Sequence, residues 1–241
     1  MTPDARTQEL HERLDVVRAR VDAACEVAGR DPSEVTLIVV SKTWPVEDVR
    51  RLAGLGVRDF GENRDQEAAP KAAATGDLDL RWHFVGQLQS NKAASVAQYA
   101  DLVHSGDRPS LVAALERGAS KAGRQLGCLL EIDLTSGATG RGGVSPVDVA
   151  ELADLVARSE HLMLRGVMGV APLSDDPAGQ RGVSAEAFER LAAISEDLCR
   201  DYPSAHLISA GMSEDLEEAV RVGATHLRVG SAVLGTRPPL G

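Results

Sequence analysis

Residues 35–45, with the sequence VTLIVVSKTWP, join a mostly apolar run to a single lysine. The run is rich in β-branched residues, which predicts a strand buried on both faces, as in a parallel sheet. Lys42 directly follows this strand, so the chain carries an amine out of its core. Burial favours the neutral amine over the ammonium, and a neutral lysine in a cleft is a nucleophile that condenses with aldehydes to form a Schiff base. The same position also suits a lysine that merely ends a strand and extends into solvent.

Strand-like and helix-like segments alternate along the rest of the chain. We expect strands at residues 35–41, 58–61, 82–88, 102–104, 128–134, 164–170, 206–209 and 226–229, and helices that include residues 45–55, 110–122, 146–159, 185–201 and 214–222. Such alternation requires parallel strands joined by right-handed crossovers. Eight strands in 241 residues favour a TIM-type (β/α)8 barrel, a fold whose usual length is about 250 residues.

A further helix is expected before the first strand, within residues 1–30. Apolar residues recur there every three or four positions from Leu10 to Ala28, which places them on one helix face. Thr2, before Pro3, is the expected N-cap, and Gly29 is the expected C-terminal stop.

An open, doubly wound sheet is the competing fold. It would carry a glycine-rich turn after its first strand, whereas the turn here, SKTW, has no glycine. The Pro, Gly and Ser residues are spread over many short turns, so no linker divides the chain. We therefore predict one α/β domain over residues 1–241, a single barrel with the additional N-terminal helix packed on it.

The composition excludes several classes of partner. A formal charge of −10 leaves no basic surface for nucleic acid or an anionic membrane, although a few basic groups can still hold a small phosphate. No apolar stretch approaches the roughly 20 residues of a membrane span, and the N-terminal segment is charged, so we expect a cytoplasmic protein. Cys25, Cys128 and Cys199 have no metal-ligand spacing, and neither do the histidines, so we expect reduced core thiols and no metal site.

Two turns of small residues are candidates for a phosphate site. In a parallel barrel the carboxyl ends of all strands meet at one rim, where phosphates often bind after the seventh and eighth strands. The turns SAGMS, at residues 209–213, and RVGS, at residues 228–231, lie at those two places. Either turn alone is adequately explained as a tight turn, but the pair opposite Lys42 favours a phosphate site. The candidate residues in it are Ser209, Gly211, Ser213, Gly230 and Ser231.

Other motifs are less specific. The segment GATGRGG, at residues 137–143, lacks the order of a nucleotide-binding loop, so we interpret it as a rim loop that carries Arg141. His83 and His104 could be acid–base groups, but histidines in apolar strands are more often core residues. Asn63 and Glu62 could position a ring or its hydroxyl, and Asn63 could equally cap the helix that follows it.

Six motifs resemble one family. The strings VSKTWP, FGENRDQEA, WHFVGQLQSNK, LRGVMGV, SAGMSEDLEEAV and LRVGSAVLG, between Val35 and Gly235, are similar to the pyridoxal phosphate homeostasis proteins, also called the YggS or proline synthase co-transcribed family. The resemblance implies a barrel like the N-terminal domain of alanine racemase, with pyridoxal 5'-phosphate bound to Lys42 as a Schiff base. It also implies a phosphate near Ser213, Gly230 and Ser231, in a pocket lined by Asn63, Met168 and Arg228.

Two main classes of function follow from this resemblance. The favoured one is a non-enzymatic carrier or buffer of pyridoxal phosphate, possessing no catalytic residues, that supplies apo-enzymes. The alternative is a racemase or a related pyridoxal phosphate enzyme, which needs a base on each face of the cofactor. Tyr99 and Tyr202 are not expected at the rim, and no second domain follows the barrel in this sequence, so we expect a monomeric carrier. A lysine-dependent aldolase is a third class, which would need a carboxylate beside the lysine.

Overall fold

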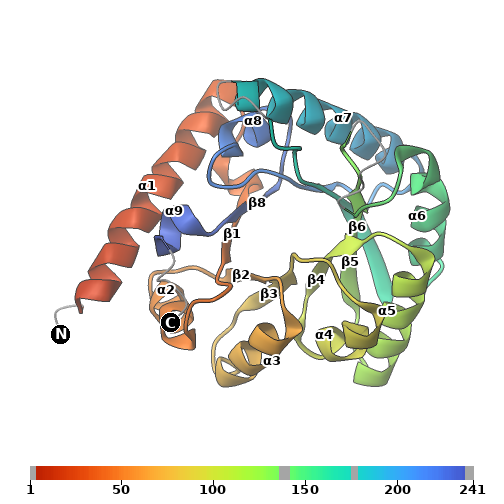
Figure 1. The fold of residues 1–241 in the computed structure, drawn as a ribbon, viewed down its shortest axis with the longest axis horizontal. Helices are drawn as coiled ribbons and strands as arrows, with labels where there is room; N and C mark the ends of the chain where they lie inside the picture. Colours follow the sequence, from red (N-terminus) through yellow and green to blue (C-terminus); the bar gives the residue numbers. More distant parts are fainter. Residues whose placement is uncertain (1–3, 136–141, 175–178, 237–241) are drawn as a thin grey trace.

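Eight parallel strands close into a barrel in the computed structural model, which describes residues 4–135, 142–174 and 179–236. Each strand pairs with its neighbours in chain order, and β8 returns to β1 (Figure 1). The strands are β1 Thr36–Val40, β2 Asp59–Glu62, β3 Arg81–Phe84, β4 Leu102–Gly106, β5 Leu126–Ile132, β6 Leu162–Gly169, β7 Leu207–Ser209 and β8 His226–Val229. The predicted TIM-type barrel is therefore confirmed.

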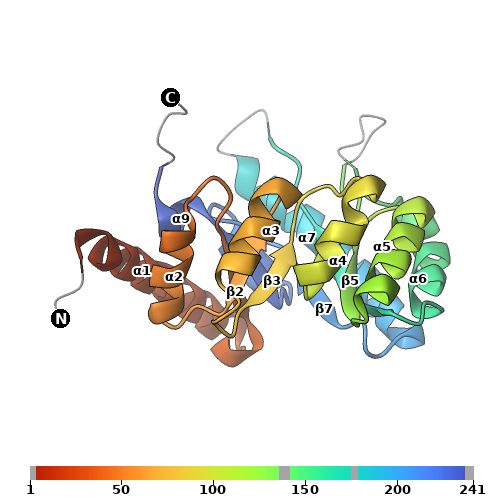
Figure 2. The same ribbon diagram turned by 90° about the horizontal axis from the view of Figure 1, so that it is seen from below.

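Helices surround the barrel and cover the outer face of the strands (Figure 2). The helices are α1 Ala5–Ala28, α2 Val46–Gly54, α3 Asp65–Ala74, α4 Ala93–Tyr99, α5 Pro109–Ala122, α6 Val149–Ala157, α7 Gln180–Asp201, α8 Leu216–Arg221 and α9 Ser231–Leu234. Short 3-10 turns, η1 Pro32–Glu34, η2 Ser90–Lys92 and η3 Pro146–Asp148, connect some of them. The expected third strand was too long, because the chain turns away after Phe84, and the expected fourth strand was two residues too short.

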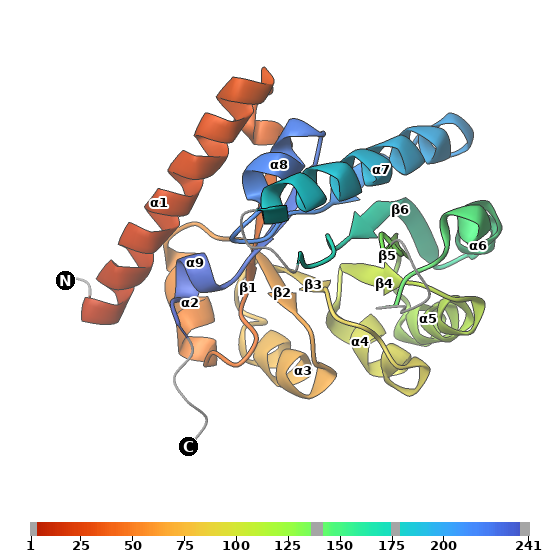
Figure 3. The same ribbon diagram turned by 45° about the horizontal axis from the view of Figure 1, so that its top comes forward.

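The N-terminal helix α1 lies outside the ring of helices, alongside α8 and α9 (Figure 3). Its buried residues recur at helical spacing and include Leu10, Leu14 and Val17, as the sequence pattern predicts. Gly29 ends the helix in the left-handed conformation at φ 66°. The N-cap is Asp4, whose carboxylate accepts the Thr7 backbone N–H at 3.0 Å; the expected cap, Thr2, lies outside the described residues.

Alternation along the strands divides the side chains between two environments. Side chains on the outer face pack against the helices in one large apolar core, which includes Phe60 and Val103. Apolar side chains inside the barrel, from Leu102, Leu129 and Met168, form a separate small cluster. Ile38 also lies inside the barrel, and the same interior holds buried polar side chains, among them His104 and Arg228, up to the rim described next.

Candidate functional site

A cavity of about 750 Å³ opens at the rim where β1, β2 and β8 end. Its walls come from the segments after these strands and from the loops after β6 and β7. Six of the nine predicted site residues line it: Lys42, Asn63, Ser213, Arg228, Gly230 and Ser231. Residues that are far apart in the sequence thus meet at the place where a parallel barrel presents its strand ends.

Lys42 stands at the start of the β1–α2 turn, where it is only partly exposed. The backbone before it continues the sheet, since the Ser41 N–H donates to the Gly61 carbonyl at 2.9 Å. Directly after it, Thr43 has a left-handed backbone with φ 67°, which a β-branched residue rarely adopts. The turn aligns Lys42 and Trp44 along the same cavity wall, so the amine is presented from a defined backbone rather than from a loose strand end.

The two predicted phosphate turns meet across the cavity. The Ser213 and Ser231 hydroxyl oxygens lie 3.3 Å apart, and the Ala232 N–H donates to the Ser213 hydroxyl at 3.4 Å. At Gly230 a Cβ atom would lie 3.2 Å from the Val40 carbonyl oxygen, which leaves little room for a side chain. Two hydroxyls beside a bare stretch of backbone form a cradle of the kind that accepts an oxyanion.

Arg228 provides a fixed positive charge beneath this cradle. Its side chain is only 5 % exposed, and its guanidinium donates to the Ser209 hydroxyl at 2.6 Å and to the Gly169 carbonyl at 3.0 Å. Burial lowers the pKa of Arg228 to about 10, against the opposing effect of the Asp215 and Glu131 carboxylates. The group therefore stays charged at neutral pH and favours an anionic ligand.

Three predicted residues lie below the cavity rather than in its lining. Met168 packs against Leu129 inside the barrel. Ser209 is fully buried and bridges His104 and Arg228. Gly211 has φ 84°, and a Cβ there would approach the Ala219 Cβ to 2.6 Å, so this glycine permits close packing of the turn. None of the three lines the cavity: Met168 and Ser209 lie inside the barrel, and Gly211 packs against α8.

The structure distinguishes between the alternative roles considered for Asn63, His83 and His104. Asn63 lines the cavity, and the N-cap of α3 is Arg64, so the capping alternative for Asn63 is wrong. Asn63 is closely packed, because a Cβ on Gly86 would come within 2.6 Å of its carbonyl oxygen. His83 and His104 are buried in the core, as favoured from the sequence.

These two histidines belong to a hydrogen-bonded chain that sequence reasoning missed. It runs from Asp59 to the His83 Nε2 at 3.0 Å, from His83 to His104 at 3.1 Å, and from His104 to the Ser209 hydroxyl at 2.9 Å. Burial lowers the pKa of His104 well below its usual value, so its ring is neutral. The signal for this chain was available, because polar residues alternated with apolar ones in several predicted strands.

Sequence reasoning also missed a buried ion pair beside the Lys42 turn. The Lys71 ammonium lies 2.6 Å from the Glu62 carboxylate, and the Ser41 hydroxyl donates to the same carboxylate oxygen at 2.8 Å. Burial raises the pKa of Glu62, while the bonds from Lys71 and Ser41 oppose that rise. Nothing in the sequence identified Lys71 as a buried lysine, because the apolar periodicity of α3 is weak.

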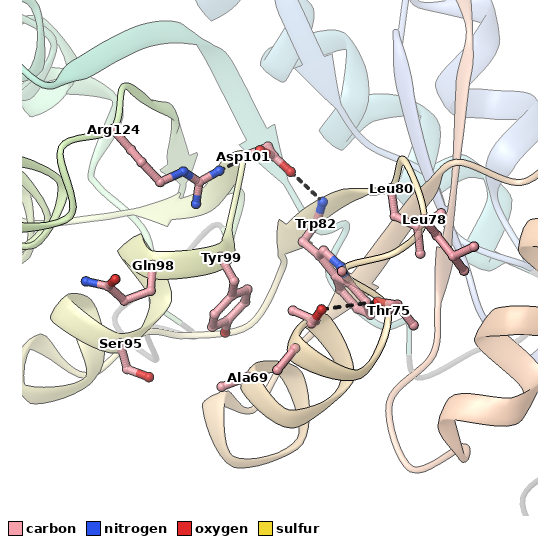
Figure 4. Close-up of a pocket in the computed structure, with 13 residues that line it drawn as sticks. Ala69, Thr75, Leu78, Leu80, Trp82, Ser95, Gln98, Tyr99, Asp101 and Arg124 are labelled. Carbon is pink, nitrogen blue, oxygen red and sulfur yellow. Dashed lines mark hydrogen bonds and ion pairs between the residues drawn. The ribbon is translucent and has the colours of Figure 1, made fainter.

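A second cavity, of about 550 Å³, lies between α3 and α4 at the opposite end of the strands. Figure 4 shows Trp82 and Tyr99 at its base, with Ala69 and Thr75 on the α3 side and Gln98 on the α4 side. Its charged groups are paired, since Arg124 donates to Asp101 at 2.8 Å and Asp101 accepts the Trp82 N–H at 2.8 Å. None of the predicted site residues lies here.

Several expected absences can be examined within residues 4–135, 142–174 and 179–236. No helix in these ranges is long and apolar enough to cross a bilayer, and they contain no cluster of three or more groups able to hold a metal ion. Cys25, Cys128 and Cys199 are all free thiols. Tyr99 and Tyr202 do not line the rim cavity. Ser136 and most of the rim loop with Arg141 fall outside the described residues.

Comparisons with known proteins identify related sequences. A model of the family described as alanine racemase, N-terminal domain, matches residues 13–238. A pyridoxal phosphate homeostasis protein of Pseudomonas aeruginosa is 39% identical over 226 residues, which cover 94% of this chain and 95% of that protein. Another, from Mycobacterium leprae, is 41% identical over 248 residues, with 95% and 93% of the two chains covered.

Solved structures of other proteins share this fold. PipY of Synechococcus elongatus, determined with pyridoxal phosphate bound, superposes with a TM-score of 0.79 at 34% identity, covering 94% of this chain and 100% of that one. Alanine racemase from E. faecalis superposes with a TM-score of 0.69 at 19% identity. The match covers 96% of this chain and 59% of the racemase, and at this identity it supports the fold alone.

Proposed function

The chain belongs to the pyridoxal phosphate homeostasis protein family, and from this premise we propose that it binds pyridoxal 5'-phosphate at the rim cavity, with Lys42 attached to the aldehyde. The observation that carries the proposal is the meeting of Lys42 with the Ser213–Ser231 hydroxyl pair in one cavity. One group suits an aldehyde and the other suits a phosphate, and pyridoxal phosphate has both.

The residues of the cavity fit this cofactor at both ends. A Cβ at Gly230 would lie 3.2 Å from the Val40 carbonyl oxygen, so glycine is the residue that fits here without crowding the backbone beside the hydroxyl pair. Arg228 adds a permanent charge, and we propose Asn63 as a ring contact because it lines the same wall. Met168, Ser209 and Gly211 are proposed as supports of the cavity floor. When bound, the cofactor supplies an aldehyde and an electron-withdrawing ring.

We propose a carrier or buffer of the cofactor rather than an enzyme. Racemisation needs a proton-transfer group on each face of the cofactor. Among the described residues that line the rim cavity, Lys42 is the one lysine, and the lining includes no tyrosine, histidine or cysteine. Glu214 and Asp215 are present, but the Asp215 carboxylate already accepts the Met212 N–H at 2.7 Å and the Ser184 hydroxyl at 3.3 Å. The lining thus favours holding the cofactor over reacting it.

We propose the compartment and the partners of the protein from its composition. Three free cysteines support a reducing compartment, which we propose to be the cytoplasm. The formal charge of −10 argues against nucleic acid and anionic membranes, and we propose a small-molecule ligand and apo-enzymes as partners. We propose that α1 and the barrel act as one domain and that the protein is a monomer, which sedimentation would test.

The experiment compares cofactor transfer with turnover. Protein loaded with pyridoxal phosphate is mixed with an excess of a pyridoxal phosphate-dependent apo-enzyme, and the recovery of that enzyme's activity is followed. The same loaded protein is incubated with L-alanine or L-serine, and the D-isomer is measured by chiral chromatography. We expect transfer without appreciable D-isomer. Formation of D-alanine at about 1 to 1,000 per second, the usual range of enzymes, would show that the protein is a racemase and not a carrier.

A further inference from the structure

The turn that carries Lys42 has an unusual backbone. Thr43 is the one non-glycine residue with positive φ among the described residues, at 67°. Such a conformation persists only where the surroundings hold it. The residues that hold this turn lie in β2 and α3, which follow α2 along the chain.

Three groups from these elements bind the two residues that flank Lys42. The Lys71 ammonium donates to the Ser41 carbonyl at 2.8 Å, and the Glu62 carboxylate accepts the Ser41 hydroxyl at 2.8 Å. On the other side of Lys42, the Glu67 carboxylate accepts the Thr43 N–H at 2.7 Å. The backbone is therefore fixed immediately before and immediately after the lysine.

Two of these groups are themselves a buried ion pair. Glu62 is fully buried and Lys71 is 8 % exposed, and their charged atoms lie 2.6 Å apart. Burying two charges is costly, and a pair of apolar side chains would often hold a helix against a strand equally well. Docking of α3 onto β2 therefore does not explain the pair. The bond from Lys71 to Ser41 does, since an apolar side chain cannot donate to a carbonyl.

The same pair connects two walls of the rim cavity. Glu62 ends β2, and the next residue, Asn63, lines the cavity beside the Lys42 turn, because β1 and β2 are paired neighbours. Glu62 binds Ser41, so the ends of β1 and β2 are joined by side chains as well as by the sheet. A change in the pair would move Lys42 relative to Asn63, whereas the contact between the Ser213 and Ser231 hydroxyls involves neither Glu62 nor Lys71.

We propose that Lys71 and Glu62 are positioning residues that set the reach of Lys42 toward the ligand aldehyde. This proposal rests on the proposed function, because it takes Lys42 as the residue that bonds the aldehyde. It assigns the ion pair no contact with the ligand. Its effect should therefore appear in binding that uses the aldehyde and be absent from binding that uses only the ring and phosphate.

The test uses two ligands and a double variant. Glu62→Gln with Lys71→Met removes both charges, so that no single charge is left buried. Binding of pyridoxal 5'-phosphate is measured by its visible absorbance. Binding of 4'-deoxypyridoxine 5'-phosphate, which has no aldehyde, is measured by calorimetry. We expect affinity for the aldehyde to fall by about 10- to 100-fold, since small misplacements of a reacting group have effects of this size, while affinity for the deoxy ligand stays within twofold.

A matched control removes another ion pair. Arg124→Met with Asp101→Asn breaks a pair of 2.8 Å beside the α3–α4 cavity, and asparagine still accepts the Trp82 N–H. We expect both affinities to stay at the wild-type values. Thermal unfolding of both double variants shows whether each is folded at the temperature used.

Two outcomes would overturn the positioning role. Equal weakening of both ligands would mean that the pair supports the whole cavity, and unchanged affinities would mean that it positions nothing. An unfolded double variant is replaced by Lys71→Gln alone, judged by the same ratio of the two affinities. Failure of the proposed function has a different signature, because Lys42→Ala would then bind the aldehyde ligand as well as wild type does.

Discussion

The rim cavity and the α3–α4 cavity differ in chemistry more than in size. The rim cavity encloses about 750 Å³ and the α3–α4 cavity about 550 Å³. The first gathers an amine, a buried guanidinium and two hydroxyls from strand ends that are distant in sequence. The second is walled by alanines and aromatic rings, and its charges are paired with each other (Figure 4). Volume alone therefore does not identify a site; convergent reactive groups do.

The largest expected effect is that of replacing Lys42, the amine of the rim cavity. Lys42→Ala removes the amine, so the visible absorbance of bound pyridoxal phosphate should vanish and affinity should fall by about 100-fold or more, because the covalent bond is lost. Arg124→Ala, the matched change in the α3–α4 cavity, should leave both unchanged. Absorbance titration measures both variants. If Lys42→Ala kept the absorbance band, Lys42 would not be the residue that bonds the aldehyde.

The second effect concerns the phosphate end of the rim cavity. Gly230→Val places a branched side chain where even a Cβ lies 3.2 Å from the Val40 carbonyl oxygen. Affinity for pyridoxal 5'-phosphate should fall by about 10- to 100-fold, the value of one or two charge-assisted hydrogen bonds. Affinity for pyridoxal, which has no phosphate, should change little. Equal losses of affinity for both ligands would mean that the phosphate does not bind beside Gly230.

The third effect is the pH dependence of stability that the raised pKa of Glu131, in β5, should cause. Burial, with the Asp107 charge, raises the pKa of Glu131 to about 7. A carboxyl whose folded pKa exceeds its unfolded value favours folding below the unfolded pKa, and that contribution is lost as pH rises through the folded pKa. Wild type should therefore lose stability relative to Glu131→Gln between pH 4.5 and about pH 8.

At 1.36 kcal/mol per pKa unit, that relative loss should reach about 1–3 kcal/mol. Urea unfolding of both proteins across this pH range measures it. Parallel stability profiles for the two proteins would mean that the pKa of Glu131 is the same in the folded and unfolded states.

The smallest effect is expected in the α3–α4 cavity itself. Ala72→Leu adds apolar volume to that cavity and should leave affinity for pyridoxal phosphate within twofold, with a change in stability of about 1 kcal/mol. Absorbance titration and thermal unfolding measure the two quantities. A fivefold change in cofactor affinity would mean that the two cavities are coupled.

Sequence reasoning recovered the architecture because it follows from local patterns. The β-branched run before Lys42 and the regular alternation of strands and helices specify a parallel barrel. The rim residues followed from topology, since strand ends must meet. Asn63 stayed ambiguous because a helix start and a cavity wall favour the same residue type.

Single side-chain contacts between elements were beyond the sequence patterns, although alternation in the strands did mark polar residues inside the barrel. The Lys71–Glu62 pair joins a helix to a strand at one point, and no period marks such a contact. The placement of Ser209 and Gly211 beneath the cavity depends on which face of a turn points inward, and that is a property of the packed barrel. Residue types and strand order were predictable, whereas the depth of each side chain was not.

The most direct test of the rim site is borohydride reduction of the loaded protein followed by peptide mapping. Borohydride fixes a Schiff base as a stable amine, and the lysines of the chain are Lys42, Lys71, Lys92 and Lys121, so each gives a distinguishable peptide. The assignment of the rim cavity predicts one phosphopyridoxyl adduct, on the peptide that contains Lys42. An adduct on Lys71, Lys92 or Lys121 with Lys42 unmodified would contradict it.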